Sequence, residues 1–566
     1  MKELKEDKEF HSKFSLSYIT RYAFKKKHSQ STSQPSYSRI FAFVYILNLI
    51  VGVGAIAMPK AFALAGWLLG LFLLIVLALL SYMTATYVIE AMATANAYGV
   101  IKRKEKERAY SYAVVIPRSI QTGEHGAMTE ESIVHRHKDT IEDAEVFDTS
   151  LVCEETSPLL HTDYSHIELY QLNTRYEMGD MANMFFNPIA RLLYYIAIIV
   201  YLYGDMAIYI ATVPKSLANI TCVSQIPSQN ISIPGSNISN RTNGTHASNG
   251  LCFGMLQFMN LYRIYIVSFI LLLGPLIFFD LSKSKWLQLF TAILRNISLI
   301  MMILIAAIQI GVGKRTMPSI ANFSFVPNLF GVIIYAFMCQ HSIPGMITPL
   351  NTKRKVNLLL FVDYFSILCY YATLAFTAAF RFNADAMEDV YTLNFKNTFP
   401  TFPILSYIIY YFLALFPVFT LSTSFPIIGI TLRENLKSLW SQFRPEKPWV
   451  IDRLLFPILA LVPPIIIAFF TMDVELLVGI TGSYAGVCVQ YLIPVALVFA
   501  SRRVIIRERG KYMNPHKSPF SHWLFLLMIV IWSVICLIVM TIDRIDSYLH
   551  FLTPNNHNNV SNYTIY

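Results

Sequence analysis

The sequence predicts an all-α polytopic membrane protein with eleven transmembrane helices. Of its 566 residues, 55% are hydrophobic and 14% are charged, whereas soluble proteins hold about 25% charged residues. Apolar segments long enough to cross a bilayer, which takes about 20 residues of helix, recur along the chain. We expect spans at residues 40–62, 66–93, 188–214, 262–281, 286–310, 327–350, 356–381, 402–430, 453–471, 474–500 and 520–542.

The first span carries polar and helix-breaking residues at mid-depth. Asn48 precedes the sequence Gly52-Val53-Gly54, and Pro59 follows. Glycine lowers helix propensity and proline removes a backbone donor, so we expect an interrupted helix. Such backbone is tolerated in a membrane only where protein or a water-filled cavity receives it. The pattern fits either a binding site at the break or a close helix contact through glycine.

The sixth span repeats this pattern. Gln340, His341 and Ser342 stand in the middle of an apolar segment, and Pro344-Gly345 follows them. The two interrupted spans are the first of each of two five-span sets, which is typical of transporters built as an inverted repeat. His341 would bind substrate or exchange a proton, or make a structural hydrogen bond.

The remaining chain divides around these two sets of spans. Residues 1–38 form a polar, basic tail, 39–310 and 326–500 hold the two repeats, 519–543 hold the last span and 544–566 form a tail. A charged insert at 95–174 is poor in apolar runs and is predicted to be disordered. It holds an acidic-dileucine pattern, Glu155 with Leu159 and Leu160, and a tyrosine pattern at 164–167. Both resemble endolysosomal sorting signals that adaptors read in the cytosol. Residues 176–187 are expected to lead as a short amphipathic segment into the third span.

The loops predict the orientation in the membrane. Lysine and arginine are roughly twice as frequent in the loops on one side as on the other, which places the N-terminus in the cytosol and the C-terminus in the lumen or outside the cell. The net charge of +10 therefore reflects topology and not a nucleic-acid partner. Cys222 and Cys252 flank the loop 218–258 in the oxidising compartment, where we expect a disulfide. Glycosylation motifs lie on the same side, at Asn219, Asn230, Asn237, Asn240, Asn243, Asn322, Asn559 and Asn562.

Polar residues inside spans are costly and are expected to face the bundle interior. Asp205 would bind a cation or proton, or make a hydrogen bond. Arg295 and Asp363 would neutralise each other if they meet, and Glu90, near a span end, would reach toward the interface. The span at 474–500 carries Gly479, Gly482 and Gly486 in a small-residue face for close helix contact.

Hydroxyl residues in the span at 402–430 suggest a cation site. Thr420, Thr423 and Ser424 fall on one helical face. Together with carbonyls freed at Asn48 and Val51, their hydroxyls would surround a small hard cation. The alternative is that they bond to their own helix, the commoner role of such residues in spans. The sequence shows no spacing typical of a metal centre or of an enzyme's nucleophile and base.

The chain resembles the amino acid/auxin permease family, within the amino acid–polyamine–organocation superfamily. The resemblance is carried by Asn48-Leu-Ile-Val-Gly-Val-Gly-Ala-Ile-Ala-Met-Pro-Lys-Ala-Phe, by Ala65-Gly-Trp and by Leu477-Val-Gly-Ile-Thr-Gly. It covers most spans, but not the N-terminal tail, the insert or residues 220–250. Tyr201-Leu-Tyr-Gly-Asp, Phe337-Met-Cys-Gln-His, Tyr391-Thr-Leu-Asn-Phe and Phe416-Pro-Val-Phe-Thr resemble one group within it more closely.

The resemblance implies a five-plus-five inverted repeat with one added span, and amino acid transport coupled to sodium or protons, with no other cofactor. Asn48 and Ser424 match positions that such families tie to sodium, whereas the Cys339-Gln-His run departs from the usual glycine-containing pattern. We expect the amino acid at Gly52, Val53, Gly54, Gln340, His341 and Ser342. Its carboxylate would meet the N-terminus of the half-helix after the break. A membrane sensor that binds an amino acid and signals through the insert is the alternative, and a channel is a third.

Overall fold

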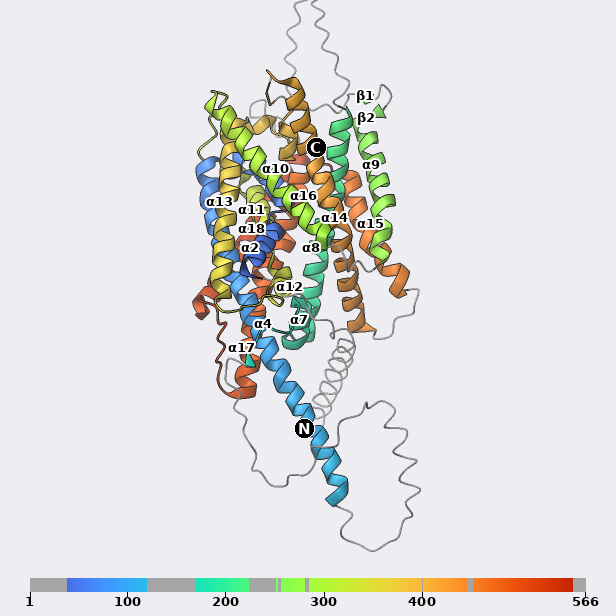
Figure 1. Ribbon diagram of the computed structural model, residues 1–566, viewed down its shortest axis with the longest axis vertical. Coiled ribbons are helices and arrows are strands. Elements are labelled where there is room, and N and C mark those ends of the chain that lie inside the picture. The colour runs from blue at the N-terminus through green and yellow to red at the C-terminus, as the bar shows by residue number, and fades with distance from the viewer. Residues whose placement is uncertain are drawn as a thin grey trace, which may run out of the picture.

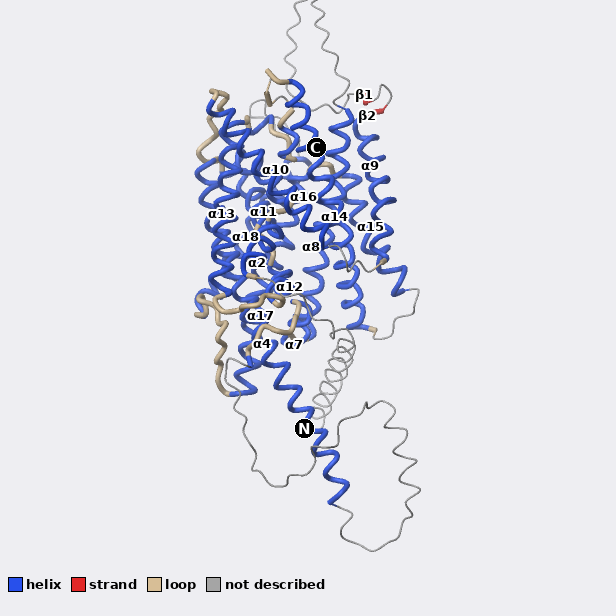
Figure 2. The backbone as a smooth tube through the Cα atoms, in the orientation of Figure 1, coloured by secondary structure: helices blue, strands red, loops and turns tan. Residues whose placement is uncertain are grey.

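The computed structural model describes residues 38–119, 169–222, 251–252, 256–279, 285–396, 398–399, 401–444 and 451–552. This part of the chain is a bundle of long, roughly parallel and antiparallel helices (Figure 1). Figure 2 shows that helices account for nearly all of it, with two short strands at one end. The all-α membrane architecture predicted from composition is therefore confirmed.

The described chain contains ten helical segments long and apolar enough to cross a membrane, and a bent pair that makes an eleventh span. The first five spans are α2 (Arg39–Ile50) with α3 (Val53–Ala65), α4 (Trp67–Ser119), α8 (Pro188–Cys222), α9 (Phe258–Leu273) with η3 (Gly274–Phe278), and α10 (Lys285–Gly311). The next five are α11 (Val326–Ala336) with η5 (Gln340–Ser342) and α12 (Ile343–Ile347), α13 (Val356–Arg381), α14 (Pro403–Phe443), η8 (Ile451–Leu455) with α15 (Phe456–Phe470), and α16 (Val474–Thr481) with η9 (Gly482–Gly486), η10 (Cys488–Leu492) and α17 (Ile493–Arg509). The last is α18 (Trp523–Leu552). Short helices lie between spans: α7 (Met178–Phe185), η4 (Phe323–Phe325), η6 (Ala384–Ala386) and η7 (Tyr391–Asn394).

Both expected helix breaks are present. The first span ends as α2 at Ile50, and α3 starts at Val53 after a bend of 56°. The sixth span leaves α-helical geometry after Ala336 and resumes at Ile343. The prediction of interrupted first and sixth spans is confirmed.

Small residues allow the half-helices to approach their neighbours closely. A Cβ added at Gly54 of α3 would lie 2.5 Å from the Cα of Ala336 on α11. A Cβ at Gly331 of α11 would lie 2.1 Å from the carbonyl oxygen of Gly479 on α16. Real Cβ atoms do not come this close, so glycine is required at both contacts. The predicted small-residue face of the tenth span thus packs against the sixth.

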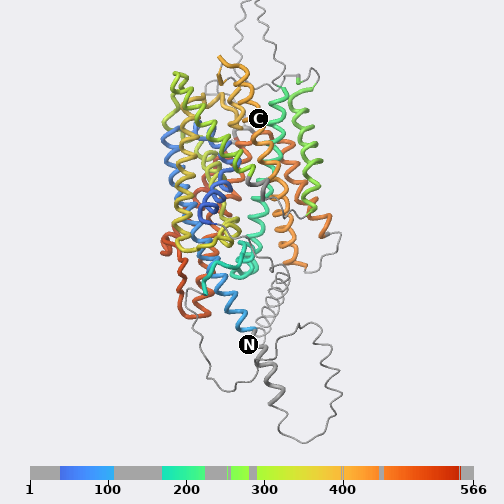
Figure 3. Tube along the Cα trace, in the orientation of Figure 1, coloured from blue at the N-terminus to red at the C-terminus, as the bar shows by residue number. Residues whose placement is uncertain are grey.

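Helices from the two ends of the chain pack together. In Figure 3, α4 and α17 lie side by side toward the end where α4 extends from the bundle. We call this end, where α2 begins at Arg39, the N-terminal face. At the other end, the opposite face, β1 (Leu251–Cys252) pairs antiparallel with β2 (Leu256–Gln257) (Figure 1).

The prediction that residues 95–174 are disordered is wrong at both ends of that segment. Helix α4 continues through the charged sequence to Ser119, and the chain is packed again from Leu169. Leu169, Tyr170 and Leu172 are buried, and the side chain of Asn96 on α4 exchanges hydrogen bonds with the backbone of Thr174. The amphipathic segment expected at 176–187 forms α7. We call residues 169–187 the docked segment. The sorting residues Glu155, Leu159 and Leu160 lie outside the described residues.

The opposite face carries the predicted covalent link. Cys222, at the end of α8, forms a disulfide with Cys252 of β1. Of the predicted glycosylation sites, Asn219 lies on the last turns of α8 and Asn322 precedes η4. The others, Asn230, Asn237, Asn240, Asn243, Asn559 and Asn562, lie outside the described residues.

Candidate functional site at the broken spans

The two breaks are held together by one tyrosine. The hydroxyl of Tyr371 on α13 lies 3.0 Å from the carbonyl oxygen of Ile50 and 3.0 Å from that of Ala336. Both carbonyls are at helix ends, where the usual intrahelical donor is missing. Tyr371, which is fully buried, therefore places the ends of α2 and α11 side by side.

A second buried side chain fills the break in the first span. The Arg295 guanidinium on α10 donates to the carbonyl oxygen of Asn48 at 2.6 Å and to that of Val51 at 2.9 Å. Arg295 is only 8% exposed. A fixed positive charge at the C-terminal end of α2 also suits the negative end of that helix dipole. The carbonyls that the sequence suggested for a bound cation thus face a cation that belongs to the protein.

The hydroxyls of the other predicted cation ligands bond within their own helix. Thr420 donates to the carbonyl of Phe416, and both Thr423 and Ser424 donate to that of Thr420. Helix α14 has its main contacts with α8, α10 and α15. The hydroxyls thus make the bonds to their own helix that the sequence offered as the alternative, and a cation shared by Asn48, Val51, Thr420, Thr423 and Ser424 stays a prediction.

The N-terminus of α3 has no side-chain cap. Gly52 caps α3 without a side-chain hydrogen bond to its first amides, those of Val53 and Gly54. Unsatisfied amides at a helix N-terminus attract anions. Gly54 also packs on Ala336, so the first turn of α3 lies directly beside the end of α11.

The three predicted residues of the sixth span differ in their surroundings. Gln340 is fully buried, and its amide nitrogen donates to the Ser81 carbonyl and the Thr84 hydroxyl of α4, both at 3.2 Å. It therefore fastens the break to α4. His341 and Ser342 are partly exposed. The His341 ring lies 5.6 Å from the Tyr201 ring, and its Nδ1 has no hydrogen-bond partner in the described structure.

Asp205 joins the third span to the sixth. The Tyr335 hydroxyl on α11 donates to Asp205 Oδ1 on α8, and Asp205 is 6% exposed. Sequence reasoning found Asp205 but missed Tyr335 and Tyr371. Both tyrosines stand in apolar runs where any aromatic residue would suit the pattern, so no signal in the sequence distinguished them.

Arg295 and Asp363 do not form the ion pair considered from the sequence. Arg295 is bonded to the first span, and both carboxylate oxygens of Asp363 on α13 are buried without a hydrogen-bond partner among the described residues. Asp363 itself is fully buried.

Comparison of the sequence with known proteins identifies its family. The sequence matches the family described as transmembrane amino acid transporter protein over residues 36–127 and 148–539. The chain belongs to that family. The match includes both broken spans and most of the insert, more than the expected resemblance covered.

Curated relatives identify the group within the family. The chain is 43% identical to transmembrane protein 104 of Gallus gallus over 515 residues, 90% of this chain and 97% of the relative. It is 43% identical to transmembrane protein 104 of Homo sapiens over 517 residues, with the same coverage. A homologue in Drosophila melanogaster is 36% identical over 531 residues, 90% of this chain and 97% of the relative. The close resemblance predicted from short motifs is to this group and is confirmed.

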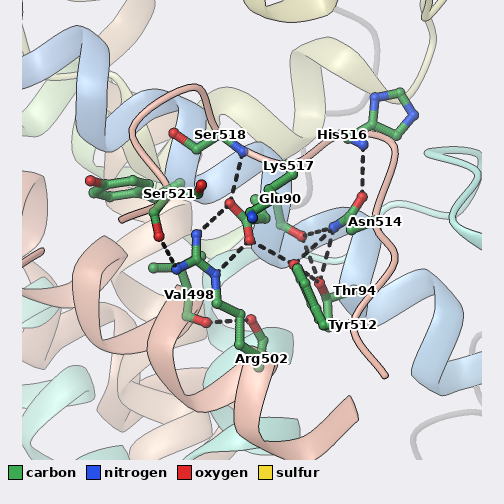
Figure 4. Close-up of polar contacts among 12 residues, drawn as sticks. Glu90, Thr94, Val498, Arg502, Tyr512, Asn514, His516, Lys517, Ser518 and Ser521 are labelled. Carbon is green, nitrogen blue, oxygen red and sulfur yellow. Dashed lines mark hydrogen bonds and ion pairs between the residues drawn. The ribbon is translucent and has the colours of Figure 1, made fainter. Parts of the chain in front are cut away.

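In this transporter-family chain, the N-terminal face is fastened by a buried carboxylate. Glu90 of α4 is fully buried and makes a two-point ion pair with Arg502 of α17, at 2.7 and 2.9 Å. It also accepts from the Tyr512 hydroxyl and the Ser518 amide (Figure 4). Burial raises the pKa of the Tyr512 hydroxyl, and the Glu90 charge raises it further. Glu90 does not reach toward the interface, as the sequence suggested, but links the second and tenth spans.

The opposite face of the family fold is fastened by two further ion pairs. Lys60 of α3 lies 3.7 Å from Glu475 of α16, which also accepts from Asn328 of α11 at 2.5 Å. Lys215 of α8 pairs with Asp389 at 2.5 Å, and the other Asp389 oxygen accepts from the Val474 amide. Burial alone would raise the pKa of Asp389, but the Lys215 ammonium and the amide hold it below its usual range. The half-helix α3 is thereby tied to α16 beyond the breaks.

Proposed function

We propose that this protein is a secondary active transporter of amino acids, working by alternating access, with its substrate bound between the two breaks. The observation that carries the proposal is the pairing of interrupted first and sixth spans, joined by Tyr371, in a chain of the transmembrane amino acid transporter family. Broken helices are tolerated at mid-depth only where protein or a water-filled cavity receives their backbone groups, and paired breaks of this kind form the substrate sites of transporters built as inverted repeats.

The substrate carboxylate is proposed to bind the uncapped amides of Val53 and Gly54 at the N-terminus of α3. The amino group is proposed to bind at the break of the sixth span, beside His341 and Ser342. These two residues are partly exposed, and His341 Nδ1 has no partner. Gln340 is excluded from this role because its amide group is bonded to α4 and to the Cys339 amide.

Transport is proposed to be independent of sodium at the first break. Arg295 already supplies a positive charge to the Asn48 and Val51 carbonyls, and an arginine side chain does not lose its proton under physiological conditions. A bound sodium ion would have to displace the guanidinium or share its ligands against charge repulsion. Sodium coupling, the other option left by the sequence, therefore has less support than proton coupling.

Uptake into proteoliposomes tests this function. Purified protein is screened with labelled amino acids, first with sodium and then with choline in its place, at equal pH on both sides. We expect uptake of at least one amino acid that is unchanged by choline. A variant with Ser342→Ala and His341→Ala should lose uptake while keeping its melting temperature. If uptake stops when choline replaces sodium, transport depends on sodium, and a sodium site at the first break would be supported instead.

We propose that the N-terminal face lies in the cytosol and that the protein resides in the endolysosomal or plasma membrane. The distribution of basic loop residues and the position of Asn219 and Asn322 on the opposite face support this orientation. Glycosidase should lower the apparent mass of the protein, as should removal of the glycosylation motifs. Replacing Leu159 and Leu160 by alanine should move an endolysosomal protein to the cell surface, because adaptors would no longer recognise it.

A sensor is the second candidate, and one observation favours it. The docked segment connects the insert to the broken sixth span, since the Arg175 guanidinium lies 3.0 Å from the Cβ position of Gly345 on α12. A ligand that shifted α12 would therefore disturb the end of the insert. Ligand-dependent capture of cytosolic proteins by the full chain, without net uptake, would favour sensing over transport.

A further inference from the structure

Among the described residues, the buried carboxyl groups differ in whether they have an ion-pair or hydrogen-bond partner. Glu90 is paired with Arg502, Asp389 with Lys215 and Glu475 with Lys60. Asp205 accepts a hydrogen bond from Tyr335. Asp363 is as deeply buried as Glu90, and neither of its oxygens has a donor in the described structure.

A carboxyl group in this position is tolerated only in its neutral, protonated form. Transfer of an unpaired charged group out of water is so unfavourable that the group takes up a proton instead. The surroundings do not offer a metal site either. Leu360 and Ile367, one turn to each side on the same face of α13, are fully buried apolar residues. The described residues contain no cluster of three histidine, cysteine or acidic side chains.

Asp363 occupies a separate position from the first break. It lies eight residues before Tyr371 on α13, which is about 12 Å along a helix, on the side of the N-terminal face. Tyr371 and Arg295 hold the break itself. The Asp363 carboxyl therefore lies between the substrate site and the N-terminal face, beside the cytosolic half of the first span in the proposed orientation.

The neighbouring charges do not neutralise Asp363. The titratable groups close enough to be affected by its charge are Cys339 and Tyr364, which bond to each other at 3.1 Å. The helices that pack on α13 are α2, α3, α4 and α10. Their described titratable or charged side chains include Arg39 and Tyr45 on α2, Lys60 on α3, Tyr82 and Glu90 on α4, and Arg295 on α10. Arg39, Tyr82 and Arg295 donate to carbonyls, and Lys60 and Glu90 have ion-pair partners.

We propose that Asp363 is the proton-binding site of the transport cycle. With the bundle packed as described, the carboxyl carries the proton as a neutral acid. When the half-helices near the N-terminal face move apart and water reaches α13, the acid releases that proton to water as the charged carboxylate. No other reactant takes part. This inference rests on the proposed transport function and identifies its coupling ion.

The Asp363→Asn variant tests the assignment, because asparagine has nearly the shape of the neutral acid but binds no proton. Proteoliposomes contain a pH-sensitive dye and are given the amino acid that the wild type takes up best. With acid outside, the wild type should accumulate substrate up to about tenfold for each pH unit and acidify the interior, since one unit is worth about 1.36 kcal/mol. The variant should exchange substrate across the membrane without accumulation or acidification. Asp385→Asn, at an exposed carboxyl, is the matched control and should behave as the wild type.

A stability measurement separates this inference from the proposed function. The Asp363→Asn variant should melt above the wild type at about pH 8, and the difference should shrink toward about pH 5. The folded wild type keeps the acid neutral, whereas the unfolded chain ionises it above a pKa of about 3.9, so the wild type loses stability as the pH rises. A difference that does not depend on pH, or gradient-driven accumulation by the variant, would overturn the proton site. If the wild type moves no amino acid, the transport function fails, and the melting experiment alone decides whether Asp363 holds a proton.

Discussion

Arg295 on α10 donates a hydrogen bond to the carbonyl oxygen of Asn48, 2.6 Å away and 247 residues earlier in the chain. Through this bond and the one to Val51, the fifth span completes the interrupted end of the first. The packing of the first span against the fifth thus depends on the Arg295 charge, for which the sequence offered Asp363 as a partner only if the two met.

Replacing Arg295 by methionine should destabilise the protein and expose a vacant cation site. The buried carbonyls of Asn48 and Val51 would each lose a donor, at a cost of about 1–3 kcal/mol. Free carbonyl oxygens are ligands for hard cations, so sodium should raise the melting temperature of Arg295→Met and leave that of the wild type unchanged. Arg315→Met, at an exposed arginine, is the control. Equal effects of sodium on all three proteins would contradict the role given to Arg295.

Replacing Glu90 by glutamine should destabilise the N-terminal face by about 3 kcal/mol, because the partly buried Arg502 would lose its counter-ion. The double variant Glu90→Leu with Arg502→Met should recover part of this loss, since neither charge is then left alone. Thermal unfolding in detergent measures both effects. A double variant as unstable as the sum of the single ones would show that the two side chains do not act as a pair.

The Lys215–Asp389 pair should survive acidification. Because the Asp389 pKa is lowered on folding, the pair contributes its stability above the unfolded pKa of about 3.9 and loses it only as pH falls through the folded value. Asp389→Asn should therefore lower the melting temperature equally at about pH 7 and about pH 5. A loss that disappeared by about pH 5 would mean that Asp389 is already protonated there.

Alanine at Gly331 should prevent the sixth span from packing on the tenth. The added Cβ would lie 2.1 Å from the Gly479 carbonyl, and backbone on both sides leaves no flexible atom to move. Overpacking of this kind costs about 1–3 kcal/mol or more. Gly311→Ala, where a Cβ meets nothing within 4 Å, is the matched control. Equal yields of folded protein from both variants would refute the close contact.

The elements that could be predicted from the sequence are those with a composition signal. The length of the apolar segments predicts the spans, and glycine, proline and polar residues at mid-depth predict the two breaks. Glu90 was misjudged because its nearness to a span end resembles that of a solvated residue, and its partner Arg502 is 412 residues away. The Arg295 contact was missed for the same reason, because nothing in a sequence says which distant carbonyl a buried side chain meets. Thr423 and Ser424 share a helical face, as predicted, but their hydroxyls donate to the Thr420 carbonyl of their own helix.

The disulfide between Cys222 and Cys252 spans 30 residues of sequence and lies between the third and fourth spans. A protease that cut the chain anywhere between these cysteines would divide the polypeptide without separating its parts. Helices α2 to α8 would remain covalently attached to α9 to α18, and the nick would appear on a gel only after reduction. If proteases reach that face, the disulfide would therefore keep the two halves of the bundle joined after a cut in this loop.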